Sequence, residues 1–152
     1  MQIESMAGVL LYISAGVPVT YDAAGYAAVS GYVSIGEIVD VGNQGATHAE
    51  TKVNTIAGAG TRKIKGSFDL GTKSLKIAVD NDDLGQQMLY TMLASYANAA
   101  FKQVYQNGDI DYFSAKVMSI VSEGSTPDAV RSISVGLAID APKGSGIIHV
   151  LA

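Results

Sequence analysis

The chain has 152 residues, no cysteine and a formal net charge of −4. The lack of cysteine excludes a disulfide-stabilised scaffold, and no apolar run reaches the ~20 residues that a membrane-spanning helix needs. Only 16% of the residues are charged, whereas an ordinary soluble domain carries about 25%. A surface that meets other protein and a compact monomer with a neutral surface both fit this composition. The length predicts one soluble domain over residues 1–152.

Charges are segregated along the chain. Residues 1–51 hold five carboxylates and no Lys or Arg, whereas residues 52–76 hold six basic residues and one carboxylate. The remainder is acidic again. Unlike charges on different segments favour a head-to-tail contact between copies, provided that folding keeps the segments apart.

The first third of the chain predicts two strands joined by an irregular segment. Residues 8–13 form a short apolar run, and residues 34–41 alternate between two faces, so each predicts a strand. Residues 15–33 are rich in Ala, Gly and Tyr, and Pro18 with the glycines argues against a regular helix there. The acidic start of the chain is not that of a secretory signal.

Residues 42–60 follow neither a helical nor a strand period. Nearly twenty residues without a pattern are long for a connection in a compact domain, and such loops are commonly functional. The glycine-rich ends are typical of an extended arm or a long hairpin. We therefore expect a long loop or hairpin at 42–60 that takes part in assembly.

The segment 61–79 predicts two strands. Alternation places three apolar side chains on one face of each: Ile64, Phe68 and Leu70 in the first, and Leu75, Ile77 and Val79 in the second. We expect both faces to be buried.

An amphipathic helix is predicted at about residues 82–97. Asp82 and Asp83 supply oxygens for the free amides at its start, and Gln86 follows Asp83 at capping-box spacing. One stripe of this helix is apolar and consists of Leu84, Met88, Leu89, Met92, Leu93 and Tyr96. Asn98 is expected to end the helix in a left-handed conformation.

The last third predicts further strands. Asn107-Gly108 indicates a two-residue hairpin turn between strands at 101–106 and 111–121. A strand at 129–139 has a core face of Ile133, Val135, Leu137 and Ile139 and an opposite face of Ser132, Ser134, Gly136 and Ala138. The run 146–151 is expected to pair as an edge strand, within the subunit or with a neighbour. Eight or nine strands and one helix predict a mainly β (α+β) fold, a β-sandwich or flattened barrel with one packed helix.

The sequence offers few groups for catalysis. His48 is expected in a loop and His149 in the last strand, and each is predicted to be a surface or interface residue rather than a base. No nucleophile-elbow or zinc-protease motif is present. We therefore expect no enzymatic activity, no cofactor and no bound metal.

Residues 60–89 combine a basic strand, a Gly-Ser-Phe turn, an alternating strand and an Asp-Asp-Leu-Gly-Gln helix start. In this order they resemble the major tail tube proteins of lambda-type, long-tailed bacteriophages. Residues 19–26 and 35–40 resemble the N-terminal half of that family. Residues 101–113 and the closing strands resemble its C-terminal half, so the resemblance spans nearly the whole chain. The tail tubes of gene transfer agents look similar.

The resemblance implies a structural subunit of the virion tail, assembled in the host cytoplasm. In this family hexameric rings stack around a tape-measure protein into a hollow tube, through which DNA passes during ejection into the host. The partners it implies are further copies of the chain, the tape-measure protein, the tail terminator, and the baseplate or tail-tip proteins. DNA is a cargo that the tube wall should not bind, and no membrane is involved.

Two sets of residues are candidates for these contacts. For ring stacking, the 42–60 loop of one ring is expected to meet the acidic N-terminal third of the next, through Glu37, Asp40, His48, Glu50, Lys52, Arg62 and Lys63. For the lumen wall the candidates are Ser132, Ser134, Gly136 and Ala138, because a nearly chargeless surface does not retain DNA through counterion release. The same face could instead pack against a neighbouring subunit or the helix.

Two other functions stay open at this point. One is the tube protein of a secretion or injection system. The other is a small-ligand-binding β-barrel, which would need a concave pocket with convergent polar groups.

Overall fold

The structure, a computed structural model, describes residues 3–152. Its main sheet is antiparallel and has the strand order β2-β1-β7-β8-β9-β6-β3, with β10 paired to β8, while β4 and β5 form a separate two-stranded sheet. The strands are β1 Leu10–Ser14, β2 Val33–Ile35, β3 Ile38–Asp40, β4 Thr47–Asn54, β5 Thr61–Asp69, β6 Thr72–Ala78, β7 Ala99–Val104, β8 Ile110–Glu123, β9 Ser132–Asp140 and β10 Ile148–Val150. The helices are α1 Ala23–Ala27, α2 Leu84–Leu93 and the 3-10 turn Pro142–Gly144.

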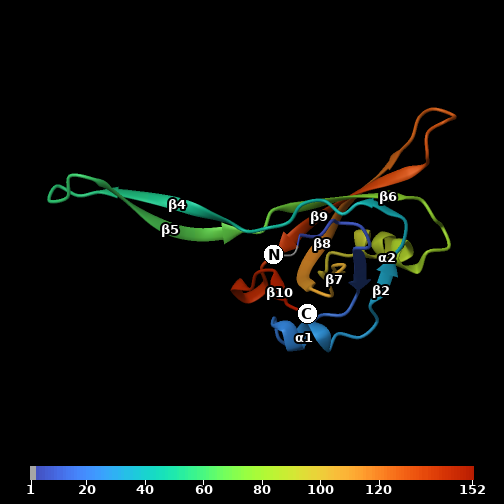
Figure 1. The fold of residues 1–152 in the computed structure, drawn as a ribbon, viewed down its shortest axis with the longest axis horizontal. Helices are drawn as coiled ribbons and strands as arrows, with labels where there is room; N and C mark the ends of the chain where they lie inside the picture. Colours follow the sequence, from blue (N-terminus) through green and yellow to red (C-terminus); the bar gives the residue numbers. More distant parts are fainter. Residues whose placement is uncertain (1–2) are drawn as a thin grey trace.

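Two hairpins project from the body in Figure 1. The hairpin β4–β5 leaves the body as a long arm, and the end of the hairpin β8–β9 extends past the body on another side. The mainly β fold with a packed helix is confirmed. A long hairpin also begins in the expected region 42–60, but its return strand β5 lies beyond that range.

The expected strand at 34–41 is broken into two. Glu37 has a positive φ of 59°, and the turn at Gly36 and Glu37 sends β2 to pair with β1 and β3 to pair with β6. These are the two edges of the main sheet. In residues 3–152 no ladder joins β2 to β3, so the sheet is open and the flattened barrel was wrong in that respect.

The main core lies between one face of this sheet and α2. The faces predicted for β6 and β9 supply much of it, with Leu75, Ile77, Val135 and Leu137 all fully or almost fully buried. Val79 packs at the margin of this cluster. The period-2 patterns of these two strands therefore identified their buried faces correctly.

A smaller apolar cluster covers the opposite face of the sheet. Asp22 caps the short helix α1 by accepting a hydrogen bond from the Gly25 amide at 2.7 Å. This helix buries Tyr26 completely, and the Tyr26 hydroxyl lies 2.7 Å from Ser114 Oγ on β8. The sequence argument against a regular helix in 15–33 was wrong for one turn, because a single cap and one buried ring are enough to hold it.

The start of α2 depends on Asp83 alone. Its carboxylate accepts from the amides of Gln86 at 2.9 Å and Gly36 at 3.0 Å, so it ties the helix to the break between β2 and β3. Asp82 makes no capping contact, and its proposed role was wrong. The Gln86 side chain does not close a capping box but bonds Asp80, Gly36 and Ala78.

The helix also ends earlier than predicted, at Leu93. Leu89 and Met92 are buried, whereas Leu84, Leu93 and Tyr96 are exposed, so only the middle of the predicted stripe packs on the sheet. Asn98 does not cap the helix. Its side chain instead bonds Asp140 and Lys116.

The largest error concerns β5, which was expected to bury one face. Ile64 is 55% exposed and Phe68 is only partly buried. The reason is that β5 pairs with β4 and with no strand of the main sheet, so the body contacts it only at its last residues, where Phe68 packs against the margin of the core. Leu70, where the chain returns to the body, is buried.

The C-terminal hairpin and strands follow the prediction with small changes. Residues 105–109 connect β7 to β8, which makes the turn longer than the two residues predicted. The closing segment pairs within the subunit, where β10 lies against residues 110–112 of β8.

The two aspartates at the start of α2 allow a matched test. Replacing Asp83 with Ala should lower the free energy of unfolding by about 1–2 kcal/mol, because it leaves two amides without their acceptor. Asp82→Ala, one residue away, should change it by only about 0.5 kcal/mol or less. Chemical denaturation of both variants measures the difference, and equal losses would contradict the assignment.

Candidate assembly surfaces

The arm β4–β5 has two different faces. Residues directly opposite each other in an antiparallel pair share a face, and the register places Glu50 opposite Lys65 and Lys52 opposite Lys63. We call these four residues the basic face. Thr51 lies opposite Ile64 and Val53 opposite Arg62, and these four form the aliphatic face.

The arm has little to hold it in isolation. Every residue of β4 is exposed, and Ile56 at the tip is fully exposed. On the basic face two lysines stand opposite each other, which is unfavourable; the ion pair between Lys63 and Glu50, at 3.6 Å and exposed, offsets this only weakly. A two-stranded hairpin is marginally stable in water, so this surface is suited to contact with another molecule.

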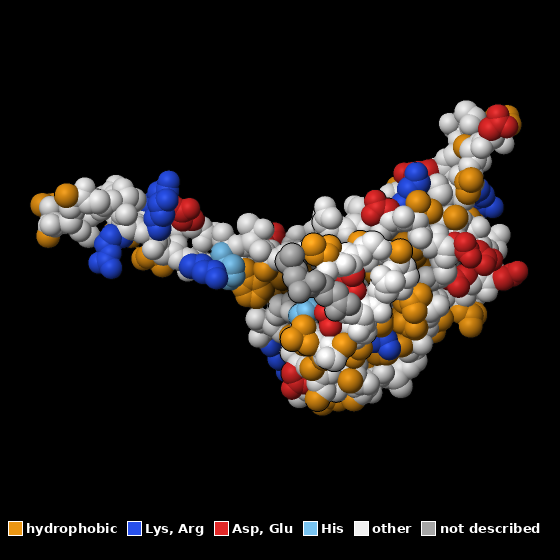
Figure 2. All heavy atoms as spheres, viewed as in Figure 1, with side chains coloured by type: hydrophobic (Ala, Val, Ile, Leu, Met, Phe, Trp, Pro, Cys, Tyr) orange, Lys and Arg blue, Asp and Glu red, His pale blue; other side chains and the backbone are white. Residues whose placement is uncertain are grey.

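The candidate stacking residues lie on two separate surfaces. His48, Glu50, Lys52, Arg62 and Lys63 are exposed on the arm, where Arg62 lies on the opposite face from Lys52 and Lys63. Glu37 and Asp40 are exposed on the body, just before β3 and at its end. Among the described residues, no ion pair links the two groups within one chain. Figure 2 shows Lys and Arg side chains along the arm and a group of Asp and Glu side chains at the far end of the body.

The candidate lumen residues share one face of β9 as predicted, but they are not equally accessible. Ser132 is 6% exposed, whereas Ser134, Gly136 and Ala138 are half-buried. The neighbouring strands extend this face with small polar side chains, such as Ser74 opposite Gly136 and Ser119 on the other side.

Two lysines on the same face have carboxylates beside them. Lys76 on β6 is in register with Asp40 on β3. Lys116 on β8 forms an ion pair with Asp140 at 3.2 Å. The sheet face that holds the candidate lumen residues therefore carries little net positive charge.

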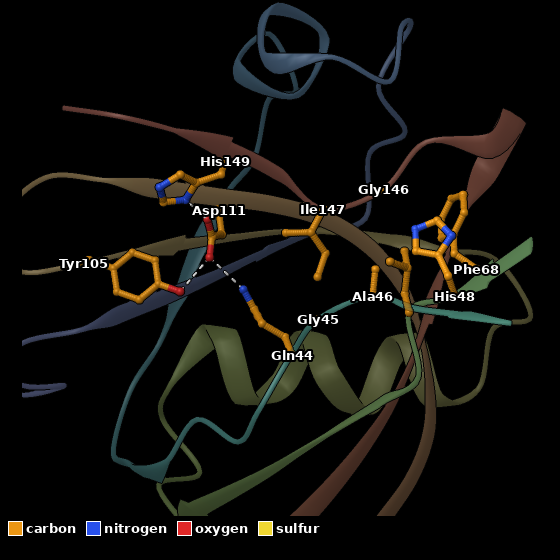
Figure 3. A pocket seen from close by; sticks show the side chains of 11 residues that line it. Gln44, Gly45, Ala46, His48, Phe68, Tyr105, Asp111, Gly146, Ile147 and His149 are labelled. Carbon is orange, nitrogen blue, oxygen red and sulfur yellow. Dashed lines mark hydrogen bonds and ion pairs between the residues drawn. The ribbon is translucent and has the colours of Figure 1, made fainter. Parts of the chain in front are cut away.

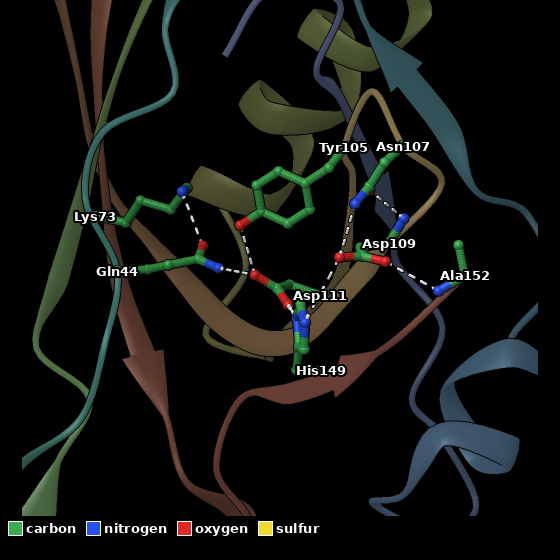
Figure 4. Close-up of polar contacts among 8 residues, drawn as sticks. All are labelled: Gln44, Lys73, Tyr105, Asn107, Asp109, Asp111, His149 and Ala152. Atoms are coloured by element: carbon green, nitrogen blue, oxygen red, sulfur yellow. Dashed lines mark hydrogen bonds and ion pairs between the residues drawn. The ribbon is translucent and has the colours of Figure 1, made fainter. Parts of the chain in front are cut away.

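A cluster of polar side chains lies at the root of the arm (Figure 4). Lys73 on β6 is 0% exposed, and its Nζ donates to Gln44 Oε1 at 2.9 Å and to Gln103 Oε1 at 3.0 Å. Gln44 Nε2 in turn donates to Asp111 at 2.8 Å. Burial lowers the pKa of Lys73 to about 8, and the charges of Asp111 and Asp40 oppose this shift.

Asp111 connects this cluster to the C-terminus. It accepts from the Tyr105 hydroxyl at 2.6 Å and is bonded to His149 on β10. Asp109 accepts from the Ala152 amide at 2.9 Å. His149, predicted to be a surface or interface residue, is thus half exposed but tied to a buried carboxylate.

This cluster was not predicted from the sequence. Its signal was present in β6, where Lys73 alternates in phase with Leu75 and Ile77 and so belongs to the buried face. A lysine in that phase indicates buried partners, because an unpaired buried charge is costly.

A cavity of about 520 Å³ opens beside the cluster (Figure 3). Phe68, Leu70 and Ile147 give it an apolar side, and Asp111 and His149 form its polar end. In residues 3–152 no group of three or more His, Asp or Glu side chains is placed to hold a metal. No helix in that range is long and apolar enough to cross a membrane.

Comparison with known proteins decides the family. A family model described as lambda phage tail tube protein, TTP, matches residues 14–138. The chain belongs to this family. No curated protein sequence matches it.

Three solved structures have a similar fold. A chain in the cryo-EM structure of an extracellular contractile injection system, PVC sheath/tube terminator in extended state, matches with a TM-score of 0.73 and 11% identity over 99% of both chains. A chain of the native gene transfer agent virion matches with a TM-score of 0.68 and 10% identity over 98% of this chain and 100% of that one. The SPP1 tail tube matches with a TM-score of 0.62 and 14% identity over 95% of this chain and 78% of that one.

His149 should make the stability of this tail tube protein depend on pH. The hydrogen bond to Asp111, with the charges of Asp111 and Asp109, raises the pKa of His149 above its ordinary 6.5, while burial opposes this shift. The protonated ring is therefore favoured in the folded state. Its contribution is complete below pH 6.5 and is lost as the pH rises through the raised pKa.

Urea denaturation of the wild type and of His149→Asn, from about pH 5 to about pH 9, measures this contribution. The difference in unfolding free energy between the two proteins should shrink as the pH rises. A difference that stays constant across this range would contradict the role of His149.

Proposed function

We propose that this protein is the tube subunit of a phage tail, and that six copies form a ring and rings stack into a hollow tube that conducts DNA during ejection. Each of the six positions in a ring would be occupied by one tail tube domain, residues 1–152. The observation that carries the proposal is the arm, a long hairpin of a tail tube family member with nearly every side chain exposed. Such a hairpin gains stability only when another molecule covers it.

Ring closure and stacking need two different contacts. A heterologous contact that closes at six gives a ring, and a second contact on the ring face that does not close gives a filament. The strands β2 and β3 are short edges of an open sheet and are available for pairing between subunits. The arm is suited to the second contact because it projects beyond the body.

Charge complementarity favours a second copy as the partner of the arm. Residues 47–69 carry four basic and two acidic side chains, so the rest of the chain carries six basic and twelve acidic ones. In this proposal Lys52, Arg62 and Lys63, flanked by His48 and Glu50, meet Glu37 and Asp40 of a subunit in the next ring. Exposed ion pairs contribute about 0–1 kcal/mol each, so they set the register while apolar contacts supply most of the adhesion.

The face of Ser132, Ser134, Gly136 and Ala138 is proposed as part of the lumen wall. Each phosphate neutralised by Lys or Arg adds affinity through counterion release. Two of the lysines on this sheet face, Lys76 and Lys116, have carboxylates beside them, and a third, Lys102, lies over the rings of Tyr12 and Tyr32. DNA would therefore pass along the wall without being retained.

The remaining partners follow from this role. The tube would enclose a tape-measure protein, end at a tail terminator and start from baseplate or tail-tip proteins. It would be assembled in the host cytoplasm and function in the virion tail, as a structural protein without catalytic activity.

A second candidate is the tube protein of an injection system. It is favoured by the fold similarity to chains of the PVC terminator structure and of the anti-feeding prophage baseplate, the latter with a TM-score of 0.65 at 8% identity. Association with capsid proteins separates the two candidates, because only a phage tail joins a capsid.

Removal of the arm tests the proposal. Replacing residues 47–69 with a Gly-Gly turn should leave a folded body, since every buried residue of the main core lies outside the arm and only Phe68 at its root packs against that core. The change should abolish tubes in negative-stain electron microscopy. The control Lys143→Ser, an exposed charge outside the arm, should leave assembly unchanged. Tubes of normal appearance from the armless protein would refute the role of the arm.

New lysines test the lumen wall. Ser134→Lys together with Ser74→Lys adds two positive charges to the proposed wall, and each phosphate contact adds affinity for DNA. Phage carrying both changes should form tails but release the genome several-fold more slowly. The control Ser122→Lys places a lysine on the opposite face of the sheet. Equal ejection rates in the wild type, the double variant and the control would exclude the face of Ser134 as the lumen wall.

A further inference from the structure

The chain enters and leaves the arm through the same buried cluster. Gln44 lies on the connection from β3 to β4, just before the arm, and Lys73 is the second residue of β6, just after it. The hydrogen bond of 2.9 Å between Lys73 Nζ and Gln44 Oε1 therefore joins the two ends of the arm's root. Figure 4 shows these two side chains entering the cluster from the same side and meeting at their ends.

Gln44 connects a buried cation to a buried anion. Its amide oxygen accepts from Lys73, and its amide nitrogen donates to Asp111 Oδ2 at 2.8 Å. Only a side chain with one acceptor and one donor at this length can serve both charges at once. Lys73 is 0% and Asp111 7% exposed, so both charges depend mainly on protein partners rather than on bulk solvent.

Asp111 belongs to the rigid part of the molecule. It lies on β8, which pairs with β7 and β10 at this point, and it is held by Tyr105 and His149 as well. Asp111 is therefore a fixed point in the body, and Gln44 fastens the start of the arm to it.

The other contacts at the root are a backbone hydrogen bond from the Ile139 amide to the Gly71 carbonyl, at 3.1 Å where the chain leaves the arm, and a few apolar contacts. Beyond Leu70, which belongs to the core, Phe68 and Ile147 pack against the margin of the core. The cavity between the arm root and the C-terminal segment leaves the remaining space unfilled. Apolar contacts of this kind resist separation but fix an angle poorly, because they are not directional.

We propose that Gln44 is a positioning residue, which fixes the direction of the arm by bridging Lys73 and Asp111 and so presets the arm for contact with the next subunit. The inference rests on the proposed role of the arm in tube assembly. A preset arm loses less conformational freedom on binding, which increases affinity without any new contact.

The direction of the arm can be measured in the free subunit. The chain has no cysteine, so spin labels can be attached only at Ile56→Cys on the arm tip and Tyr96→Cys on the body, both exposed in the structure. Electron–electron resonance then gives the distribution of distances between them. The wild-type background should give one narrow distribution.

Two variants separate bridging from space filling. Gln44→Ala removes both hydrogen bonds, and Gln44→Glu keeps the length and the acceptor for Lys73 but, when ionised, repels Asp111 instead of donating to it. Both should broaden or shift the distance distribution. The control Gln106→Ala, an exposed glutamine in the β7–β8 turn, should not. Unchanged narrow distributions in both Gln44 variants would overturn the proposal.

A third variant covers the case in which the buried Glu prevents folding. Gln44→Asn has the same amide but is shorter by one methylene group, so it reaches only one of the two charges. It should broaden the distribution as Gln44→Ala does. A narrow distribution in Gln44→Asn would show that bridging is not required and would overturn the proposal.

Assembly provides the second measurement. Gln44→Ala should raise the protein concentration needed for tube formation about tenfold, which corresponds to ~1.4 kcal/mol of lost preorganisation. A broadened distribution with unchanged assembly would overturn the link to assembly. If the wild type formed no tubes at all, the proposed function would fail, while the distances would still decide whether Gln44 positions the arm.

Discussion

Strand β8 is 14 residues long and pairs with β7 along one side and with β9 and β10 along the other. Its inward side chains lie in the main core, and its outward side chains Tyr112 and Ser114 hold α1 through Tyr26. The same strand carries Asp111, on which the C-terminus and the root of the arm converge. Pairing along β8 is therefore the constraint on which both cores and the polar cluster depend.

The body and the arm are stabilised in different ways. The body buries two apolar clusters against the two faces of one sheet. The arm buries almost nothing, and its backbone bonds are made only within its own hairpin. A protein that works by assembly can keep such an element because its missing contacts are supplied by the next copy, whereas in a monomer an uncovered ribbon with exposed Ile and Val side chains would favour aggregation.

A buried cation at the root of the arm is costly unless its partners are well placed. The hydrogen bonds of the Lys73–Gln44–Asp111 bridge offset the cost of burying the Lys73 charge. By the same geometry they restrain the chain where it enters the arm. His149 adds a charge that is favoured at low pH on the far side of Asp111. Stability of the body, attachment of β10 and direction of the arm thus share one carboxylate.

The sequence by itself determined which side chains share a face, because alternation and helical periodicity are local properties. It correctly gave the buried faces of β6 and β9, the cap at Asp83 and, through its resemblance, the tail tube family. It could not determine whether a face has anything to pack against. Ile64 lies in a good strand pattern yet is exposed, because β5 leaves the body. Lys73 is buried because its strand lies between β9 and β3 and because Gln44 and Gln103 bind its side chain. Those outcomes, like the break at Glu37 that separates the two sheet edges, depend on partners distant in the sequence and were decided only by the tertiary structure.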